Sequence, residues 1–594
     1  MSGTTLENGP PSSSTSSFST LKQEEVSSNL VSSSPNLVEM TAPTESSDAS
    51  RHEAVTNKRA SLNRSNTLPK DMSKAESVVV LNRDKLQQFR QWMLCIVVAY
   101  FDVDYGPKVE SIHPAVELNP QECENIAFSA FPDTSHGATS IHIHSFRIRS
   151  DYARRLSIPD DVEETLKYKQ DDGFLYGYSA FLQQKDKTSK RGYSQRSIIF
   201  LTRHQFPALF SAAIATAIPM FQKHGNEMLE TAIHGISSWP ALQAGATLEL
   251  GFLGSILHVE IPKSIDQQQL TETASFGEAF DPHLHILASH PPLEYAAVEI
   301  FQAILPSLWS LWECIVLAEP IFLYAPSPAI ASAAIWWLRD WVRPLPMAGD
   351  FRPYFTIHDP DHKRFMNKNA PVAGIMIGTT NPFLYEECKH WPHIVSLTPS
   401  KTTPSPGPTP GFKTTHRRYI SKDRVLLKQL ETAMHKAATN STSRTGSSSS
   451  HERLSVSNLL RQHFAARARA LLVPLNRYLT TLMPIQPSAS TLSITGNSSP
   501  ASTFQANAQR QRARAESTER LAPFSTVDMM ASLEKNGSPL PFKSSSRRRE
   551  FYQRWLRTPA FGAWLVREEE VVNRVLAERR EPASSANATS SLTN

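Results

Sequence analysis

Residues 372–397 read VAGIMIGTTNPFLYEECKHWPHIVSL, and this stretch indicates the fold of the second part of the chain. It opens with a fully apolar strand, Val372–Thr380, continues with a helical segment, Asn381–His390, and ends with a short strand, His393–Leu397. Strands that alternate with helices are typical of a largely parallel sheet with helices on both faces. We therefore predict a three-layer α/β arrangement.

The same alternation begins after Trp239. Short strands are predicted at Ile256–Ile261, His283–Leu287 and Pro320–Ala325, and helices at Tyr295–Leu305 and Pro328–Val342. The α/β arrangement is therefore expected to start where the pattern changes, near Trp239.

Before Trp239 the pattern is one of antiparallel strands followed by a helix, which predicts an α+β unit. The apolar run Trp92–Phe101 and the segment Lys108–His113, separated by a Gly-Pro turn, predict a hairpin. In the next strand the apolar parity shifts between Ile143 and Phe146, which predicts a bulge. The further strands are predicted at Ile141–Arg149, Phe174–Leu182 and Arg196–Thr202, and the helix at Phe206–Phe221.

Polar segments are expected to lie outside the folded core. Residues 1–88 are rich in Ser and Thr and poor in large apolar residues, so burial cannot offset the entropy cost of ordering them, and we expect a disordered tail. Four closely spaced prolines predict a stiff linker or surface insert at 399–416. Polar inserts are also expected at 438–450 and 485–525, and a second disordered tail at 581–594.

Three C-terminal segments have helical spacing of their apolar residues. We predict a basic helix at 421–437, a helix at 456–483 with a break near Pro474, and an amphipathic helical region at 548–580.

The overall composition excludes several classes of protein. The 594 residues are 40% hydrophobic and 20% charged, as in a globular protein with polar inserts. A net charge of +5 is too small to indicate a nucleic-acid-binding protein, whereas the basic residues near the C-terminus suit contact with an anionic membrane. The N-terminus lacks signal-peptide features and the apolar region 304–342 is interrupted by charges and prolines, so we expect a cytoplasmic protein.

Neither the cysteines nor the histidines form a strong metal-binding pattern. The four cysteines lie far apart without a CxxC pair, which argues against disulfides and against a cysteine-based zinc site. His142 and His144 alternate on a predicted strand near His136, but an isolated HxH pair usually belongs to a strand face. We predict no metal and no cofactor.

Motifs for covalent catalysis are missing from the sequence. It contains neither GxxxxGK[ST] nor a GxGxxG after a strand, so a P-loop GTPase or a kinase is excluded. It also contains neither a GxSxG elbow nor an HExxH pair. We therefore do not expect an enzyme that makes or breaks covalent bonds.

Three residues lie in phosphorylation patterns. Lys58-Arg-Ala-Ser61 and Arg154-Arg-Leu-Ser157 resemble sites of basophilic kinases. Arg64-Ser-Asn-Thr67-Leu-Pro69 has the spacing that 14-3-3 proteins recognise after phosphorylation, because their arginines pair with the phosphate. We predict phosphorylation at Ser61, Thr67 and Ser157, and 14-3-3 binding through Thr67.

Several segments, in the same order, resemble proteins of the DENN domain family, and most closely its sixth class. The central ones are Asp350-Phe-Arg-Pro-Tyr-Phe-Thr-Ile-His-Asp359, Gly378-Thr-Thr-Asn-Pro-Phe383 and His390-Trp-Pro-His-Ile394, preceded by Leu311-Trp-Glu-Cys-Ile-Val-Leu-Ala-Glu-Pro320 and Ala325-Pro-Ser-Pro328. Lys190-Arg-Gly-Tyr-Ser-Gln195, Leu459-Leu-Arg-Gln-His-Phe464 and Phe551-Tyr-Gln-Arg-Trp-Leu556 extend the resemblance to about residues 90–580.

The resemblance implies a tripartite DENN module with two lobes. Residues 89–243 are expected to form a longin-like upstream module, 244–400 a Rossmann-like central α/β module, and 401–580 a downstream helical region that completes the second lobe. It also implies a guanine nucleotide exchange factor that binds a Rab GTPase in the cleft between the lobes and releases its GDP. The recycling-endosome branch of the Rab family, and recruitment to endosomal membranes, are implied as well.

The candidate Rab-binding residues are expected on loops that face the cleft. They are Lys187, Arg191, Asp350, Phe351, Arg352, Tyr354 and Asn381. Phe351 and Tyr354 are expected to be apolar anchors, and Arg352 a donor to an acidic loop of the GTPase. One alternative is that the segment starting at Asp350 supports the edge of the sheet. An alternative function is a non-catalytic Rab effector or trafficking scaffold, which would prefer GTP-loaded Rab.

Overall fold

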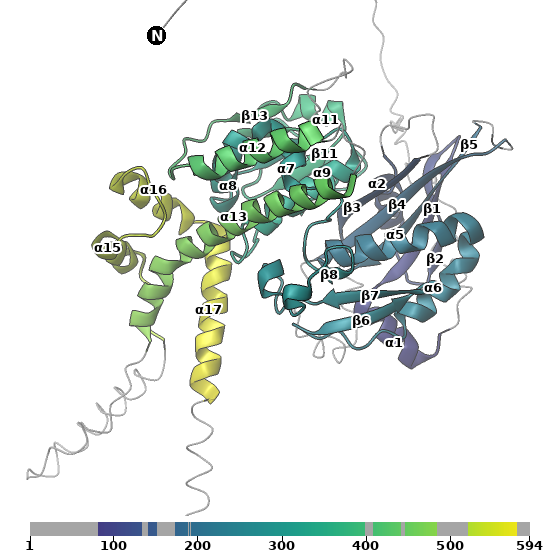
Figure 1. The fold of residues 1–594 in the computed structure, drawn as a ribbon, viewed down its shortest axis with the longest axis horizontal. Helices are drawn as coiled ribbons and strands as arrows, with labels where there is room; N and C mark the ends of the chain where they lie inside the picture. The colour runs from purple at the N-terminus through teal and green to yellow at the C-terminus, as the bar shows by residue number, and fades with distance from the viewer. Residues whose placement is uncertain are drawn as a thin grey trace, which may run out of the picture. The chain divides into compact units, whose positions relative to one another are not determined.

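The computed structural model describes residues 81–132, 140–150, 173–187, 189, 192–397, 408–440, 446–483 and 521–578. These residues all belong to one unit of the chain, residues 64–594 (Figure 1). They form a mixed α/β structure with two five-stranded sheets and one three-stranded sheet. The predicted phosphorylation sites Ser61, Thr67 and Ser157 lie outside the described residues.

The first sheet is antiparallel throughout and has the strand order β2-β1-β5-β4-β3. Its strands are β1 (Cys95–Asp102), β2 (Gly106–His113), β3 (Ser140–Arg149), β4 (Phe174–Lys185) and β5 (Tyr193–Thr202). The predicted hairpin is confirmed, because β1 pairs with β2 through the turn before Gly106.

The predicted bulge in β3 is wrong. Over its whole described length β3 pairs with β4 in a constant register, from Ser140 opposite Gln183 to Arg149 opposite Phe174. The parity shift has another cause: β3 is buried on both faces from His144 to Ile148, so apolar residues are favoured on both sides. A register shift occurs instead in β1, between Val98 and Ala99.

Helices cover both faces of the first sheet. They are α1 (Arg83–Trp92), α2 (Pro120–Ser129), α5 (Pro207–His224) and α6 (Met228–Ile236), with a 3-10 turn at Gly225–Glu227. Helix α5 packs on one face, where Phe210 stacks on Tyr178 of β4, and α2 packs against β2 and β3. We did not predict α2, although its capping box, in which Asn119 and Glu122 bond each other's backbone amides, is visible in the sequence.

The predicted boundary of the N-terminal tail at residue 88 is corrected by α1. This helix begins at Arg83, because the Asn82 side chain accepts a hydrogen bond from the Lys85 amide. Its Phe89 and Trp92 side chains are fully buried in the core of the first sheet.

The second sheet is largely parallel, as predicted. Its strand order is β10-β11-β9-β12-β13, and β13 alone runs antiparallel to its neighbour. The strands are β9 (Ile321–Tyr324), β10 (Phe351–Arg352), β11 (Met376–Thr379), β12 (His393–Ser396) and β13 (Gly411–Thr414). Strand β13 corrects the linker predicted at 399–416, because the edge of β12 offers backbone groups that residues 411–414 pair with.

The second sheet is buried on both faces. Ile321 and Leu323 of β9 belong to the main core, whereas Phe322 and Tyr324 belong to a separate cluster on the opposite face. The helices beside this sheet are α7 (Ala297–Ile300), α8 (Leu308–Val316), α9 (Pro328–Trp341), α10 (His362–Phe365) and α11 (Pro382–Glu387). The helix predicted at Tyr295–Leu305 is divided into α7 and a 3-10 helix, Gln302–Ser307.

A third, small sheet lies between the other two in the sequence. It consists of β6 (Thr247–Phe252), β7 (Ser255–Glu260) and β8 (His285–Leu287), with 3-10 turns at Thr271–Thr273 and Gly277–Ala279. The strands β7 and β8 were predicted, whereas β6 was not.

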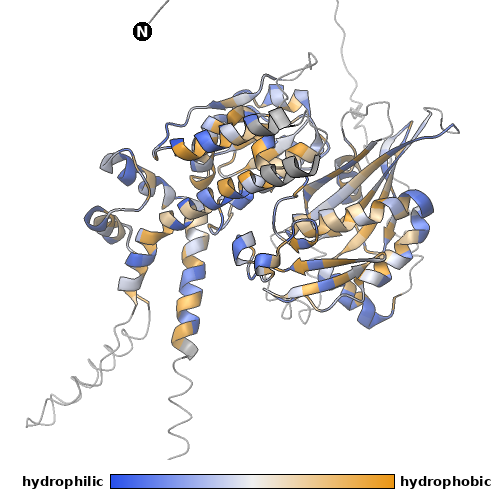
Figure 2. Ribbon diagram, viewed as in Figure 1, coloured by the Kyte–Doolittle hydropathy of each residue, from blue (hydrophilic) through white to orange (hydrophobic). Residues whose placement is uncertain are grey.

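The C-terminal helices add to the second core. They are α12 (Arg424–Asn440), α13 (Gly446–Leu482), α15 (Thr526–Asn536), α16 (Ser545–Trp555) and α17 (Pro559–Glu578). Helix α13 continues through Pro474, so the predicted break is wrong; Leu471 and Leu475 on either side are fully buried and hold the helix in place. Figure 2 shows blue and orange residues alternating along α17, as in an amphipathic helix.

The predicted polar inserts are only partly described. The ends of the segment 438–450 continue α12 to Asn440 and begin α13 at Gly446, which corrects the prediction for those residues. Most of 485–525 and all of 581–594 lie outside the described residues. No helix in the described ranges combines the length and low polarity needed to cross a membrane.

Candidate functional site

A cluster of six charged side chains joins the first sheet to the second. We call it the Arg352 cluster, and its members are Arg147, Arg149, Asp350, Arg352, Asp359 and Asp361. Two of the arginines come from β3, whereas the other four residues come from β10, the residue before it and the loop after it.

Arg352 is the centre of this cluster and is fully buried. Its Nε and Nη2 atoms donate to both oxygens of Asp350, at 2.9 and 3.0 Å, and its Nη1 donates to Asp359 at 3.0 Å. A further hydrogen bond reaches Asp361. Burial alone would lower the pKa of Arg352, but the surrounding carboxylates raise it above its ordinary value. Arg352 is therefore charged at every pH at which the protein is folded.

The arginines of β3 reach the same carboxylates from the other sheet. Arg147 donates to Asp350 at 2.9 Å and to the Phe351 carbonyl at 3.1 Å, and its guanidinium lies 3.6 Å from the centre of the Phe174 ring. Arg149 donates to Asp361 at 2.9 Å. Three positive and three negative groups thus balance one another, as buried charges require.

These contacts correct our expectation that the segment beginning at Asp350 forms a surface loop. Phe351 packs between Tyr176 and Trp336, and Tyr354 enters the core of the first sheet. Phe351, Arg352 and Tyr354 are each at most 2% exposed, and Asp350 is mostly buried. The alternative, in which this segment supports the sheet, agrees with their burial.

The other predicted residues lie elsewhere. Lys187 is exposed beyond the end of β4, and Arg191 lies outside the described residues. Asn381 begins α11, where its side chain accepts a hydrogen bond from the Phe383 amide at 2.9 Å. The structure therefore keeps Asp350, Phe351, Arg352 and Tyr354 together in one buried segment. Lys187 and Asn381 lie on other elements.

An open hollow lies just beyond the buried segment. We call it the Phe groove; it has a volume of about 330 Å³, and its lining includes Phe101, Phe128, Phe131, Phe181, Ile357 and His358. The phenylalanines come from the first sheet, α2 and the segment after α2, whereas Ile357 and His358 come from the loop after β10. The ring of His358 stacks on that of Phe128, with centroids 3.4 Å apart.

Exposed apolar side chains lie at the same end of the first sheet. Val103, Tyr105, Ile141 and Ile357 are 42, 63, 44 and 47% exposed. The strand registers place the turn between β1 and β2, the start of β3 and the tip of the β4–β5 hairpin at this end, so Lys187 lies there as well. Exposed apolar residues gathered in one region are typical of surfaces on which another protein docks, so this end of the sheet is a candidate docking surface.

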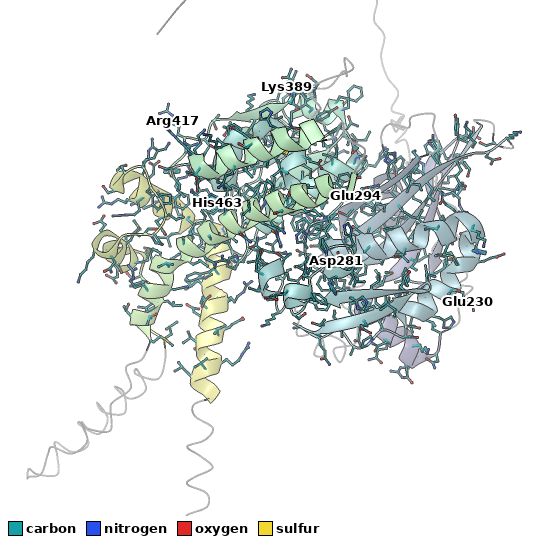
Figure 3. The ribbon with its side chains drawn as sticks, in the orientation of Figure 1. Glu230, Asp281, Glu294, Lys389, Arg417 and His463 are labelled. Atoms are coloured by element: carbon teal, nitrogen blue, oxygen red, sulfur yellow. The ribbon has the colours of Figure 1, made fainter. Side chains whose placement is uncertain are left out.

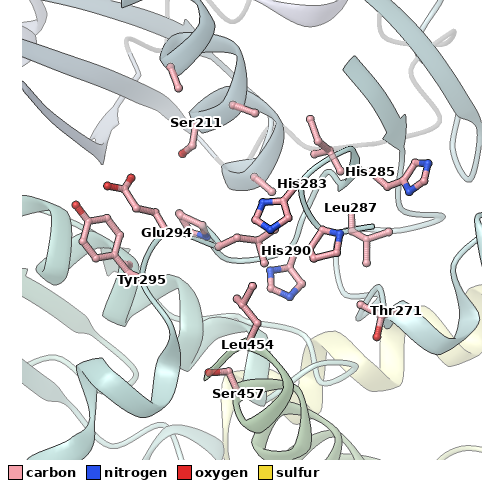
Figure 4. A pocket seen from close by; sticks show the side chains of 18 of the residues that line it. Ser211, Thr271, His283, His285, Leu287, His290, Glu294, Tyr295, Leu454 and Ser457 are labelled. Carbon is pink, nitrogen blue, oxygen red and sulfur yellow. The ribbon is translucent and has the colours of Figure 1, made fainter. Parts of the chain in front are cut away.

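A second hollow, of about 800 Å³, lies between α5 and α13, and we call it the α5–α13 cleft. Figure 4 shows His283 and His290 between Ser211 of α5 and Leu454 of α13. Burial, together with the positive charge of the nearby Arg461, lowers the pKa of His290 to about 3, so this imidazole is neutral near pH 7. Ile256, Leu284 and Leu459 are exposed residues on its lining.

Sequence reasoning did not select the exposed part of the segment 350–359. Ile357 and His358 belong to the stretch that resembles the DENN family, yet we selected the residues before them. Phe351, Tyr354 and Phe355 of the same stretch are also apolar or aromatic, and only packing distinguishes these buried residues from the exposed ones. His142 and His144 do not form a metal site in the described structure, because His144 bonds the Ser129 carbonyl at 2.8 Å and His142 stacks on Phe181.

Comparison with known proteins identifies the family. No model of a protein family matches the chain. The mouse protein DENND6A is 29% identical over 514 residues, which are 82% of this chain and 78% of that protein. Human DENND6B is 28% identical over 84% of this chain and 83% of its own length, and the DENND6 homolog of Dictyostelium discoideum is 25% identical over 80% and 70%. These similarities over about four fifths of the chain support its assignment to the DENN domain family, in the class of the DENND6 proteins.

Proposed function

We propose that this protein is a guanine nucleotide exchange factor for a Rab GTPase. The observation that carries the proposal is the similarity to DENND6 proteins over about four fifths of the chain, because the DENN family is associated with exchange on Rab GTPases. The lack of motifs for covalent catalysis supports it, since exchange alters binding equilibria and breaks no covalent bond.

The reaction is driven by a difference in affinity. An exchange factor binds the nucleotide-free GTPase more tightly than the GDP-bound form, and by thermodynamic linkage it weakens the binding of GDP by the same factor. The switch segments of a GTPase are ordered by contacts with the nucleotide and Mg²⁺. A surface that holds these segments in another position therefore releases GDP.

We place the docked GTPase over the Phe groove and its exposed rim. A stable protein interface covers about 800 Å² on each partner, which requires the rim residues as well as the hollow itself. Ile357 and Tyr105 would supply apolar anchors, and Lys187 would approach acidic residues of the GTPase. Arg191, which lies outside the described residues, and Asn381 remain candidate contacts.

The Arg352 cluster has a positioning role in this proposal. The Phe groove takes one wall from the first sheet and the other from the loop after β10, and the cluster fixes that loop to β3. Phe351, Arg352 and Tyr354 would therefore act on exchange through the placement of Ile357 and His358.

The decisive experiment measures release of fluorescent GDP from a panel of purified Rab proteins, with and without this protein, at physiological Mg²⁺. We expect acceleration confined to one or two Rabs, and tighter binding to nucleotide-free Rab than to GTP-loaded Rab. Binding that prefers the GTP-loaded form, without acceleration, would instead identify an effector or scaffold. The panel includes Rabs of recycling endosomes, since the family resemblance implies that branch and endosomal recruitment.

Two regulatory contacts belong to the same proposal. We infer that phosphorylated Thr67 binds 14-3-3 proteins, and that basic C-terminal residues contact anionic membranes. A phosphorylated peptide around Thr67 that fails to bind 14-3-3 proteins would remove the first. The contact with anionic membranes predicts that the protein binds vesicles that contain anionic lipid, and that this binding is lost as the salt concentration rises.

A further inference from the structure

Three side chains from separate segments converge near the start of the adjacent strands β9 and β12. They are Cys314 of α8, Glu319 of the turn before β9, and His393 at the start of β12, and their ligand atoms all lie within 4.8 Å of one another. A fourth residue, His416, follows β13 and places its Nδ1 atom 3.3 Å from Glu319 Oε2. We propose that these four residues bind one Zn²⁺ ion.

The donor atoms suit Zn²⁺ in number and in kind. One thiolate sulfur, two imidazole nitrogens and one carboxylate oxygen are a four-coordinate set of the type that this borderline-soft ion prefers. In a tetrahedral site the distances from the metal are about 2.3 Å for sulfur and about 2.0–2.2 Å for nitrogen and oxygen. Two ligand atoms of such an ion lie about 3.4–3.7 Å apart, so the three atoms that already lie within 4.8 Å of one another are close to the required separation.

Both histidines have their outer nitrogens held by other groups. His416 Nε2 lies 2.7 Å from Glu313 Oε2, and His393 Nδ1 lies 2.8 Å from the Thr414 hydroxyl. Glu313 is itself fixed, because its oxygens accept hydrogen bonds from the Tyr419 and Ile420 amides. A carboxylate that holds the outer nitrogen of a histidine is the usual support of a metal-binding imidazole. The inner nitrogens are thereby aimed at Glu319.

The contacts of Glu319 also point to a shared cation. Its Oε2 atom lies 2.6 Å from His393 Nε2 and 3.3 Å from His416 Nδ1, yet no donor among the described atoms meets it with hydrogen-bond geometry. The 3.3 Å separation is close to the roughly 3.4 Å between two ligands of one tetrahedral ion, whereas the 2.6 Å separation would lengthen when the ion binds. The Oε1 atom of Glu319 accepts from Arg554 at 2.5 Å and lies 3.4 Å from His416 Nδ1, so Oε2 is the atom that we assign to the metal.

The site is buried but has a path for entry. Cys314 is fully buried, and a hollow of about 530 Å³ is lined by Glu319, His393 and His416 and leads to solvent. Arg417, on its rim, points outward (Figure 3). With Zn²⁺ bound, the Cys314 thiol loses its proton and both imidazoles are neutral. The ion's two charges are then balanced by Cys314 and Glu319, while Arg467 is a cation whose charge interacts with that of Glu313.

A bound ion would fasten α8 to both β12 and the segment after β13. All four ligands come from the protein, so the site has no open position for a substrate, and the role is structural. The absence of a CxxC pair argued against a zinc site with several cysteines, but a site with single residues from four segments leaves no such spacing in the sequence.

The test uses the full chain without a histidine tag. Metal content after equilibrium dialysis against micromolar Zn²⁺ is measured by mass spectrometry, and Co²⁺ titration reports coordination. We expect one ion per chain, and with Co²⁺ a near-ultraviolet thiolate charge-transfer band together with the visible bands of tetrahedral coordination. Cys314→Ala should remove the thiolate band. The matched control is Cys388→Ala, because Cys388 is equally buried but contacts Met366 in another part of the second sheet.

Supporting residues and stability give independent readouts. Glu313→Gln should weaken Zn²⁺ binding by about 10–100-fold, as removal of an outer partner does in other metal sites. Zn²⁺ should raise the Tm of the wild-type protein and of Cys388→Ala, but not that of Cys314→Ala. Metal content well below one per chain in the folded wild-type protein would overturn the proposal. A Co²⁺ spectrum that is the same in Cys314→Ala would also overturn it, and would show adventitious surface binding only.

Discussion

His358 stacks on Phe128 with 3.4 Å between ring centroids and 13° between ring planes. Phe128 belongs to α2, which covers the first sheet, and His358 follows β10 of the second. The two walls of the Phe groove therefore touch each other directly, in addition to their connection through the Arg352 cluster. The shape of the groove depends on this contact and on the cluster behind it.

The stack between these rings should have a measurable coupling energy. In a double-mutant cycle with Phe128→Ala and His358→Ala, we expect about 0.5–1.5 kcal/mol from urea unfolding. Both single variants should slow GDP release. Lys363→Ala changes an exposed residue of α10, the helix that follows this loop, and serves as the control for a general effect on this part of the chain. Additive single-variant effects on stability would show that the stack contributes nothing.

Ile357→Asp should reduce the acceleration of GDP release by at least about 10-fold, whereas the Tm of the protein should change little. The reason is that a half-exposed side chain tolerates a charge in the free protein but not in an apolar interface. Leu459→Asp, on the α5–α13 cleft, is the matched control. If Leu459→Asp abolishes exchange and Ile357→Asp does not, the GTPase docks at the α5–α13 cleft.

Arg352→Ala should destabilise the protein by about 3–5 kcal/mol, because it leaves the buried Asp350 and Asp359 without their cation. Chemical denaturation measures the loss. Arg364→Ala, which removes an exposed arginine of α10, should cost less than about 0.5 kcal/mol. A folded Arg352→Ala protein with wild-type stability and full exchange activity would refute the positioning role.

Gly177→Ala should be strongly destabilising, because the added Cβ would lie 2.2 Å from the ring of Phe146, which is opposite Gly177 on the neighbouring strand β3. Overpacking of this kind costs about 1–3 kcal/mol. Gly251→Ala in β6 is the control, since its Cβ would have no neighbour within 4 Å. Equal stability losses in both variants would mean that the cost arises from the backbone rather than from Phe146.

Acid should destabilise the protein through buried histidines. Burial lowers the pKa of His144 and of His204 to about 4, although each ring has a hydrogen bond to a backbone carbonyl that opposes the shift. Between pH 6.5 and 4 the unfolded chain therefore binds protons that the folded protein does not. The stabilisation that each neutral histidine gives is fully present above about pH 6.5. Below that, the free energy of unfolding falls by about 1.4 kcal/mol per pH unit for each histidine.

Urea unfolding at several pH values between 7 and 4.5 tests this expectation. His144→Gln and His204→Gln should each reduce the slope of stability against pH by about 1.4 kcal/mol per unit. Slopes that match the wild-type slope in both variants would assign the acid sensitivity to other groups.

Much of the fold was readable from the sequence because its signals are local. The apolar run Val372–Thr380 contains β11, and Ser327-Pro328 provides the cap and first turn of α9, so strand and helix follow from neighbouring residues. The strand β13 was not readable, since a strand at a sheet edge exists only if its partner β12 is next to it. Pro474 shows the same limit, because burial of Leu471 and Leu475 outweighs the local preference for a break.

The sequence by itself determined the alternation of strands and helices, the absence of covalent catalytic motifs and the likeness to the DENN family. Only the tertiary structure decided that Phe351, Arg352 and Tyr354 are buried while Ile357 is exposed, and that Cys314, Glu319, His393 and His416 meet. The reason is physical: secondary structure depends on residues a few positions apart, whereas exposure and ligand geometry depend on which distant segments pack together.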